Sequence, residues 1–94
     1  VLDLSANMIG DTTMFELEKA CLDHPKLRVV NLEGNLITDQ GSYSLSKVSR
    51  QFRSLNVSHN KIGAPGIAAL LASSGEKNCR LESFEFLRTW HGPQ

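Results

Sequence analysis

The segment "LRVVNLEGNLITDQG", residues 27–41, decides the fold that this chain adopts. It begins like a short β-strand with V-V-N-L, but it soon reaches Asn35, and asparagine is a poor strand residue that is costly to bury without hydrogen-bond partners. The pattern returns downstream as "FRSLNVSHNKIGAPG", residues 52–66, with Asn60 in the place of Asn35. The recurrence indicates a repeated structural unit.

The repeat extends over nearly the whole chain. The opening "VLDLSANMIGD", residues 1–11, carries Asn7 on the same grid, and a fourth unit carries Thr89 where the asparagine is expected. Successive units start about 25 to 29 residues apart, a period typical of solenoids in which neighbouring units stack. The shared apolar columns align Leu27 with Phe52, Val30 with Leu55, Leu32 with Val57 and Ile37 with Ile62.

Each unit reads as a strand, an asparagine turn, a helix and a return loop. Alternation predicts that Val30 and Leu32 point into the core, and Met14 and Leu17 recur at helical spacing on one buried face. The pattern therefore predicts an α/β solenoid. Its short parallel strands are expected near residues 2–4, 30–32, 55–57 and 84–86, and its helices near 12–23, 40–50 and 65–74.

Polar residues mark the turns. Asp11 and Asp39 are predicted to cap the helices that they begin, and Pro65 is expected in the first turn of the third helix. The asparagines are predicted to be buried at the strand ends, because a side-chain amide offers a donor and an acceptor to the backbone of its own turn and of the neighbouring coil. This column comprises Asn7, Asn35 and Asn60.

The segments "VVNLEGNLITDQGSYSLSKV" and "SLNVSHNKIGAPGIAALLAS" resemble the ribonuclease-inhibitor type of leucine-rich repeat. The resemblance implies a curved right-handed coil with parallel strands on the concave face and helices on the convex face. The group that it points to includes ribonuclease inhibitors, Ran GTPase-activating proteins, innate-immune sensors and ciliary subunits. One departure from the pattern is Thr13, which stands where later units have Gly41 and Gly66.

Length and charge limit the function classes. The 94 residues are expected to form a single domain, 1–94, of three to four repeats, and the chain opens inside a repeat strand, as expected of a fragment of a longer chain. Ten basic residues balance ten acidic residues, which argues against nucleic acid and acidic membranes as partners. No apolar run approaches the roughly 18 residues of a membrane span.

The two cysteines favour a reducing compartment. Cys21 lies on the expected buried helix stripe, and Cys79 lies in the loop before the fourth strand. Each is expected to be a free thiol, with Cys21 acting as a small apolar side chain. The predicted location is therefore intracellular and cytoplasmic, and the resemblance adds the cytoskeleton and the cilium.

Catalytic and metal-binding patterns are absent from the sequence. The three histidines do not have the spacing of metal ligands, and no glycine-rich phosphate loop occurs. Ser58 and His59 are adjacent, but neighbouring strand residues point to opposite faces, which is a poor geometry for a nucleophile and its base. We therefore expect neither an enzyme nor a bound cofactor or metal ion.

The remaining candidate is a surface for protein partners. The strand residues that point away from the core are expected to form an extended concave face. The candidate partner-binding residues are Arg28, Asn31, Glu33, Arg53, Asn56, Ser58, His59, Glu85 and Arg88.

The sequence thus predicts a non-enzymatic interaction or scaffold module in a larger assembly. Further repeats or a neighbouring subunit are expected to cover its apolar end, and Trp90 is expected to cover the other end. Two alternatives stay open, a regulator of a GTPase of the activating type and an enzyme inhibitor that uses the concave face.

Overall fold

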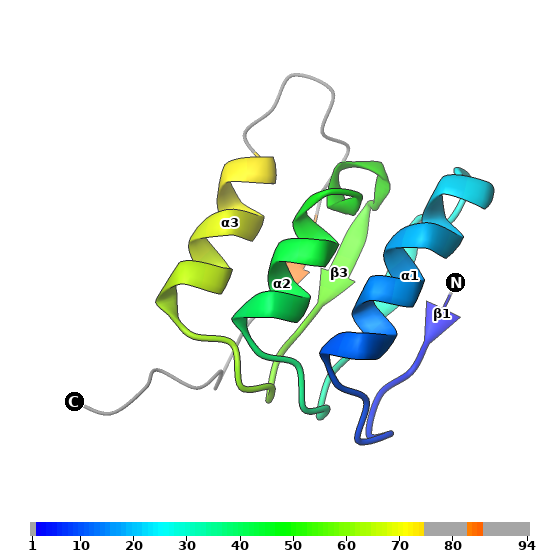
Figure 1. The fold of residues 1–94 in the computed structure, drawn as a ribbon. Coiled ribbons are helices and arrows are strands. Elements are labelled where there is room, and N and C mark those ends of the chain that lie inside the picture. The colour runs from blue at the N-terminus through cyan, green and yellow to red at the C-terminus, as the bar shows by residue number, and fades with distance from the viewer. Residues whose placement is uncertain (1, 75–82, 86–94) are drawn as a thin grey trace.

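The fold is taken from a computed structural model that describes residues 2–74 and 83–85. The elements are β1 (Leu2–Asp3), α1 (Asp11–Asp23), β2 (Val29–Asn31), α2 (Asp39–Ser46), the 3₁₀ helix η1 (Ser49–Gln51), β3 (Ser54–Asn56), α3 (Ala64–Ser74) and β4 (Ser83–Glu85). The strands form one sheet in the order β1-β2-β3-β4. Figure 1 shows the helices side by side in a layer that covers one face of this sheet.

The predicted stacking of units is confirmed by the strand register. All three strand pairs are parallel, and Val30 of β2 lies between Leu2 of β1 and Leu55 of β3. Neighbouring strands lie about 4.8 Å apart whereas packed helices need about 8–10 Å, so a stack of such coils bends with its sheet on the inside. The sheet face turned away from the helices is therefore the concave face of the solenoid.

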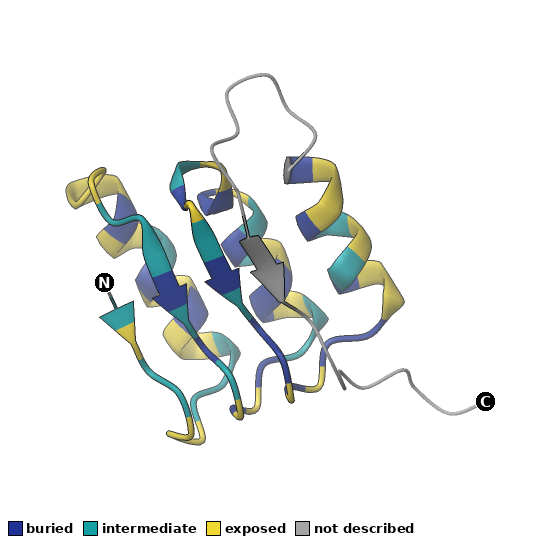
Figure 2. Cartoon of the chain, turned by 180° about the vertical axis from the view of Figure 1, so that it is seen from behind, coloured by how far each residue is buried: buried dark blue, intermediate teal, exposed yellow. Residues whose placement is uncertain are grey.

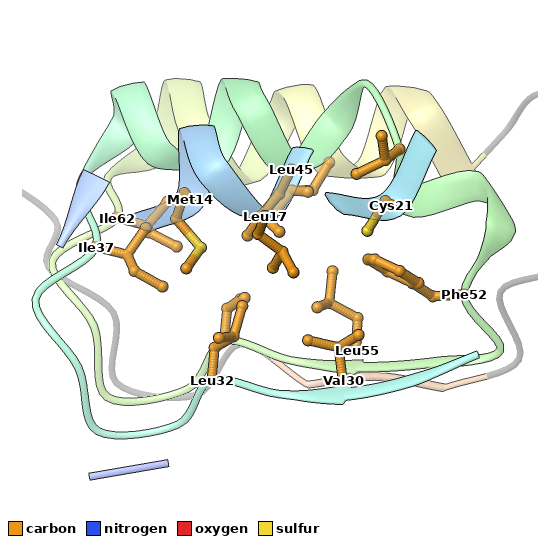
Figure 3. Packing of buried hydrophobic residues seen from close by; sticks show 13 residues of the cluster. Met14, Leu17, Cys21, Val30, Leu32, Ile37, Leu45, Phe52, Leu55 and Ile62 are labelled. Carbon is orange, nitrogen blue, oxygen red and sulfur yellow. The ribbon is translucent and has the colours of Figure 1, made fainter. Parts of the chain in front are cut away.

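The core fills the space between the helices and the sheet, as Figure 3 shows. Val30 and Leu32 are 1% and 0% exposed, which confirms their predicted inward orientation. Cys21 is a free, buried thiol within this cluster, as expected. The buried apolar residues are Met14, Leu17, Cys21, Val30, Leu32, Ile37, Leu45, Val48, Phe52, Leu55, Val57, Ile62 and Leu70.

The strands end about one residue earlier than predicted because their last residues turn the chain. The Asn31 Oδ1 accepts a hydrogen bond from the Glu33 N–H at 3.0 Å, two residues along the chain. Asn56 repeats this contact with the Ser58 N–H at 3.0 Å. Such side-chain turns compete with the strand ladder and end it.

The predicted helix over residues 40–50 is wrong at its C-terminal end. Helix α2 ends at Ser46, and the separate 3₁₀ turn η1 follows. Serine competes with helical hydrogen bonds, and the Ser46 hydroxyl donates to the carbonyl of Tyr43. Further on, the Ser49 hydroxyl lies 3.0 Å from the hydroxyl of Ser73 on α3, so this turn is fixed to the next coil.

Asn35 brackets two coils, as predicted. Its Oδ1 accepts from the N–H groups of Asn7 and Ile9, both at 2.9 Å. Its Nδ2 donates to the carbonyls of Leu4 and Leu32, both at 2.9 Å. The side chain is 4% exposed, so water has little access to these backbone groups. Asn60 makes the equivalent contacts one coil later, with the Ile37 N–H and the Leu32 carbonyl.

The prediction that Asp11 and Asp39 cap their own helices is wrong. Each is the first helical residue, and the N-cap positions are held by Gly10 and Thr38 without a side-chain cap bond. The Asp11 Oδ1 accepts instead from the N–H groups of Thr38 (2.8 Å) and Gly41 (3.0 Å) at the start of the next helix. Asp39 repeats this with the N–H groups of Gly63 (2.8 Å) and Gly66 (3.0 Å).

These aspartates explain why Gly41 and Gly66 lack side chains. A Cβ atom at Gly66 would lie 2.5 Å from the Asp39 Oδ1, and one at Gly41 would meet the Asp11 carboxylate equally closely. The approach therefore requires glycine on the receiving helix. Thr13 occupies the corresponding position on α1, where it is exposed.

We predict that Asn35→Ala lowers the free energy of unfolding by about 1–3 kcal/mol, because buried backbone groups of two coils lose their partners. Asn7→Ala is the matched control. The prediction that Asn7 is buried like Asn35 is wrong, because Asn7 is exposed and its side-chain bond within the described chain goes to the Ser5 carbonyl. We expect its cost to stay within about 0.5 kcal/mol. Urea unfolding of both variants measures the difference, and equal costs would contradict the bracketing role.

A second prediction concerns pH. Burial raises the pKa of the Cys21 thiol. Because this acidic group has a higher pKa in the folded than in the unfolded chain, its contribution to stability is present below the unfolded thiol pKa of about 8.5 and is lost as the pH rises above it. Urea unfolding between about pH 7 and pH 10 should show a steeper loss of stability for the wild type than for Cys21→Ala. Parallel pH dependences would show that Cys21 does not contribute.

Candidate functional site

The concave face carries the predicted column of polar strand residues. Asp3 pairs in register with Asn31, Asn31 with Asn56, and Asn56 with Glu85. Figure 2 views this face of the sheet and shows a buried residue in the middle of β2 and β3, flanked by partly exposed ones. The register thus brings Asn31 and Asn56 together. The side chain of Glu85 and all of Arg88 lie outside the described part of the structure.

A three-residue polar cluster joins two coils at the end of this face. The Asn56 Nδ2 donates to the Glu33 Oε1 at 3.1 Å. The His59 Nε2 lies 3.8 Å from the Glu33 Oε2, and both side chains are 43% exposed. His59 has a positive φ of 58° at the tight turn after β3. The cluster is therefore accessible, carries the acidic group of Glu33, and has its geometry fixed by the turn.

Asp3 adds a second acidic group at the exposed end of the same column. The N–H and the hydroxyl of Ser5 both donate to its carboxylate, and these hydrogen bonds lower the pKa of Asp3. Hydrogen bonds to a carboxylate favour its charged form. Asp3 therefore remains ionised at neutral pH, and the described part of the concave face presents carboxylates beside amides.

Three predicted site residues do not belong to this exposed face. Ser58 is only 3% exposed, because the chain folds inward after Asn56 takes its N–H, so its hydroxyl is not on the surface. Arg28 and Arg53 precede their strands and lie at the return loops. The Arg28 Nη1 donates to the carbonyls of Pro25 and Gln51, so this guanidinium braces two loops.

The cluster offers hydrogen-bonding and electrostatic recognition. Ser58 is buried and His59 lies beside Glu33, so the groups that this cluster offers at the surface are those of Glu33, Asn56 and His59. Within residues 2–74, no histidine, cysteine, aspartate and glutamate side chains gather as a metal site. No helix in the described chain has the length and apolar character needed to cross a bilayer.

Sequence reasoning missed the cross-coil role of Gln51. Its Nε2 donates to the carbonyls of His24 (3.2 Å) and Leu27 (3.3 Å), one coil away. It also missed the link between Asn56 and Glu33. The strand columns placed these two residues on adjacent coils, but their contact is diagonal and depends on the side-chain rotamers that the turns impose.

We predict that Asn56→Ala lowers the free energy of unfolding by about 0.5–1.5 kcal/mol, since it removes the turn bond to Ser58 and the contact with Glu33. Its place on the outer face of the strand would by itself predict a small contribution to stability. The cost should be smaller than that of Asn35→Ala, because Asn56 is only partly buried. Chemical unfolding of the two variants in parallel tests the order, and a cost near zero for Asn56→Ala would restore the sequence-based expectation.

Comparison of the sequence with known proteins identifies a family and two relatives. A sequence profile described as "Leucine Rich repeat" matches residues 23–46 and 48–71. The ribonuclease inhibitor of Sus scrofa is 36% identical over 94 residues, covering 95% of this chain and 20% of the inhibitor. The ribonuclease inhibitor of Mus musculus is 37% identical over 86 residues, covering 86% of this chain and 19% of the inhibitor. The chain thus spans about a fifth of the length of these relatives.

Proposed function

The chain belongs to the leucine-rich repeat family, and from this we propose that it is a non-enzymatic protein-binding module that contributes part of a larger interaction surface. The observation that carries the proposal is the accessible cluster of Glu33, Asn56 and His59 on the concave face. A stacked solenoid offers such a face to a macromolecular partner over several coils at once.

The partly buried apolar side chains at the β1 end support the proposal that the chain is part of a larger structure. Leu2, Leu4 and Ile9 pack against the core but are only partly buried. An apolar solenoid end needs a cover, which we propose is a further coil of the same protein or a neighbouring subunit. The free thiol of Cys21 supports a reducing, cytoplasmic setting for this assembly.

Charge-altering variants of the full protein test the binding face. Glu33→Arg combined with His59→Glu changes the concave cluster. Glu16→Arg combined with Ala68→Glu makes the same charge changes on exposed positions of α1 and α3. We expect partners recovered with the wild-type protein to bind the helix-face variant normally and the concave-face variant at least about tenfold more weakly in direct titrations. Equal binding by both variants would refute the concave face as the docking surface.

The inhibitor alternative has a specific observation in its favour, the identity of 36–37% to ribonuclease inhibitors over most of the chain. We propose a ribonuclease as the first enzyme to test. The assay measures RNA cleavage by a ribonuclease with increasing full protein, for the wild type and both double variants. Inhibition lost only in the concave-face variant would support this role. No inhibition would leave the binding-module proposal in place and remove the ribonuclease. The GTPase-regulator alternative stays a prediction.

A further inference from the structure

The fold separates the charges of this neutral chain onto two edges. We name the return-loop edge as residues 23–28 and 47–53, which contain five lysine and arginine residues and a single acidic residue, Asp23. The opposite edge, where strands lead into helices, covers residues 3–11, 31–39 and 56–63. It carries Asp3, Asp11, Glu33 and Asp39 against one lysine, Lys61. The overall charge of zero thus conceals a basic edge and an acidic edge.

The parallel topology gathers the basic residues. Because the described strand pairs are parallel, the two described return loops meet at one end of the sheet, which is the upper end in Figure 1. Arg28 and Arg53 occupy matching positions one residue before β2 and β3, and the Arg53 N–H donates to the Arg28 carbonyl at 2.6 Å. The basic residues of this edge are Lys26, Arg28, Lys47, Arg50 and Arg53.

The loops that carry these charges are braced against each other. The Arg28 guanidinium reaches across to the Gln51 carbonyl at 3.2 Å, and the Gln51 side chain reaches back to the carbonyls of His24 and Leu27. Reciprocal contacts between two return loops limit their motion before a ligand arrives. A preorganised surface loses less conformational freedom when it binds.

We propose that the return-loop edge docks an acidic segment of a partner protein, lying extended across the coils. This surface is distinct from the concave cluster, so the inference goes beyond the function proposed above. The edge joins two neighbouring coils, which lie about 5 Å apart at the strands and about 10 Å apart at the helices, and an extended peptide rises about 3.3 Å per residue, so a run of about two to three acidic residues matches the edge. Carboxylates pair well with arginine and lysine side chains.

The observations favour a protein segment over nucleic acid. Nucleic-acid surfaces combine a strong positive field with exposed aromatic side chains for stacking. On the return-loop edge the aromatic residue is Phe52, which is 0% exposed. The acidic opposite edge also cancels the field at long range, so the attraction acts over short distances and suits a short ligand.

The proposal uses charge and position alone. Arg50 and Arg53 also interact within the protein. The proposed docking depends on the positive charge of the edge and does not require unused hydrogen-bond donors on these two residues. Lys26 and Lys47 are exposed and supply the residues for mutation.

Binding of poly-L-glutamate to the full protein tests this surface. Lys26→Glu with Lys47→Glu changes the return-loop edge. Lys19→Glu with Lys61→Glu makes the same net change at exposed positions on α1 and on the opposite edge. In fluorescence titrations at low salt we expect the first pair to weaken binding about tenfold and the second by less than about twofold, with wild-type binding falling as salt is added. Thermal melting of both variants confirms that each is folded.

Three further results would overturn the proposal. Equal weakening by the two lysine pairs would mean that total charge, and not this edge, governs binding. Failure of the folded wild-type protein to bind poly-L-glutamate at low salt would exclude acidic segments as ligands. A single-stranded oligothymidine is titrated in parallel, and tighter binding of this probe than of poly-L-glutamate, lost in the return-loop variant, would assign the edge to nucleic acid instead. The concave-face variants are expected to bind poly-L-glutamate like the wild type, which separates this test from that of the proposed function.

Discussion

The structure depends on buried asparagine amides that satisfy the backbone of two coils at once. Where the chain leaves β2 and β3 it must turn inside the protein, and its N–H and C=O groups are there shielded from water. Asn35 and Asn60 supply both a donor and an acceptor at this point. Because each side chain reaches the preceding coil as well as its own, the same contact that permits the turn also fixes the stacking. The strand register and the position of the helix layer follow from it.

The strands are short because polar side chains also bond the backbone at their ends. After two or three residues, Asn31 and Asn56 take the N–H two positions ahead and bend the chain toward the bracketing asparagine. The side chains that end the strands are thus the ones that line the concave face. Recognition groups such as Glu33 and Asn56 stand on backbone that is already fixed by these turns. Structure and surface chemistry are built from one set of residues.

The sequence predicted the features that recur in each repeat unit. The buried Asn35 and Asn60, the inward position of Val30 and Leu32, the parallel sheet and the helix layer all follow from spacing, because stacked units must place equivalent residues in equivalent environments. Asn7, which the same spacing predicted to be buried, is exposed. The sequence was a poor guide to contacts between units. The carboxylate of Asp39 was expected to serve its own helix, since a local rule cannot show that the N–H groups of the next helix lie closer in space.

In the candidate site, too, the repeat predicted which residues align between coils but not the contacts that depend on the turns and loops. The register brought Asn31 and Asn56 together as the columns implied, but the burial of Ser58 depends on a turn whose depth no periodicity reveals. Arg28 illustrates the second difficulty. Its position in the repeat was assigned correctly, yet its direction is set by the carbonyls of Pro25 and Gln51, which belong to loops of different coils. Side-chain direction outside the regular elements is a property of the assembled stack.

The joints between helices have a polarity. In each, a carboxylate from one helix enters a space that only glycine leaves open on the following helix, so the joint has a carboxylate side and a glycine side that cannot be exchanged. Helix α2 carries both halves, with Gly41 toward α1 and Asp39 toward α3. Helix α1 carries Thr13 in place of the glycine, and α3 carries Ala64 in place of the aspartate. A duplicated α2 unit would therefore fit between α1 and α3. It would not fit before α1, where its carboxylate would meet Thr13, or after α3, where its glycine would meet no carboxylate. The residues at these two positions of each helix thus determine the order of the units.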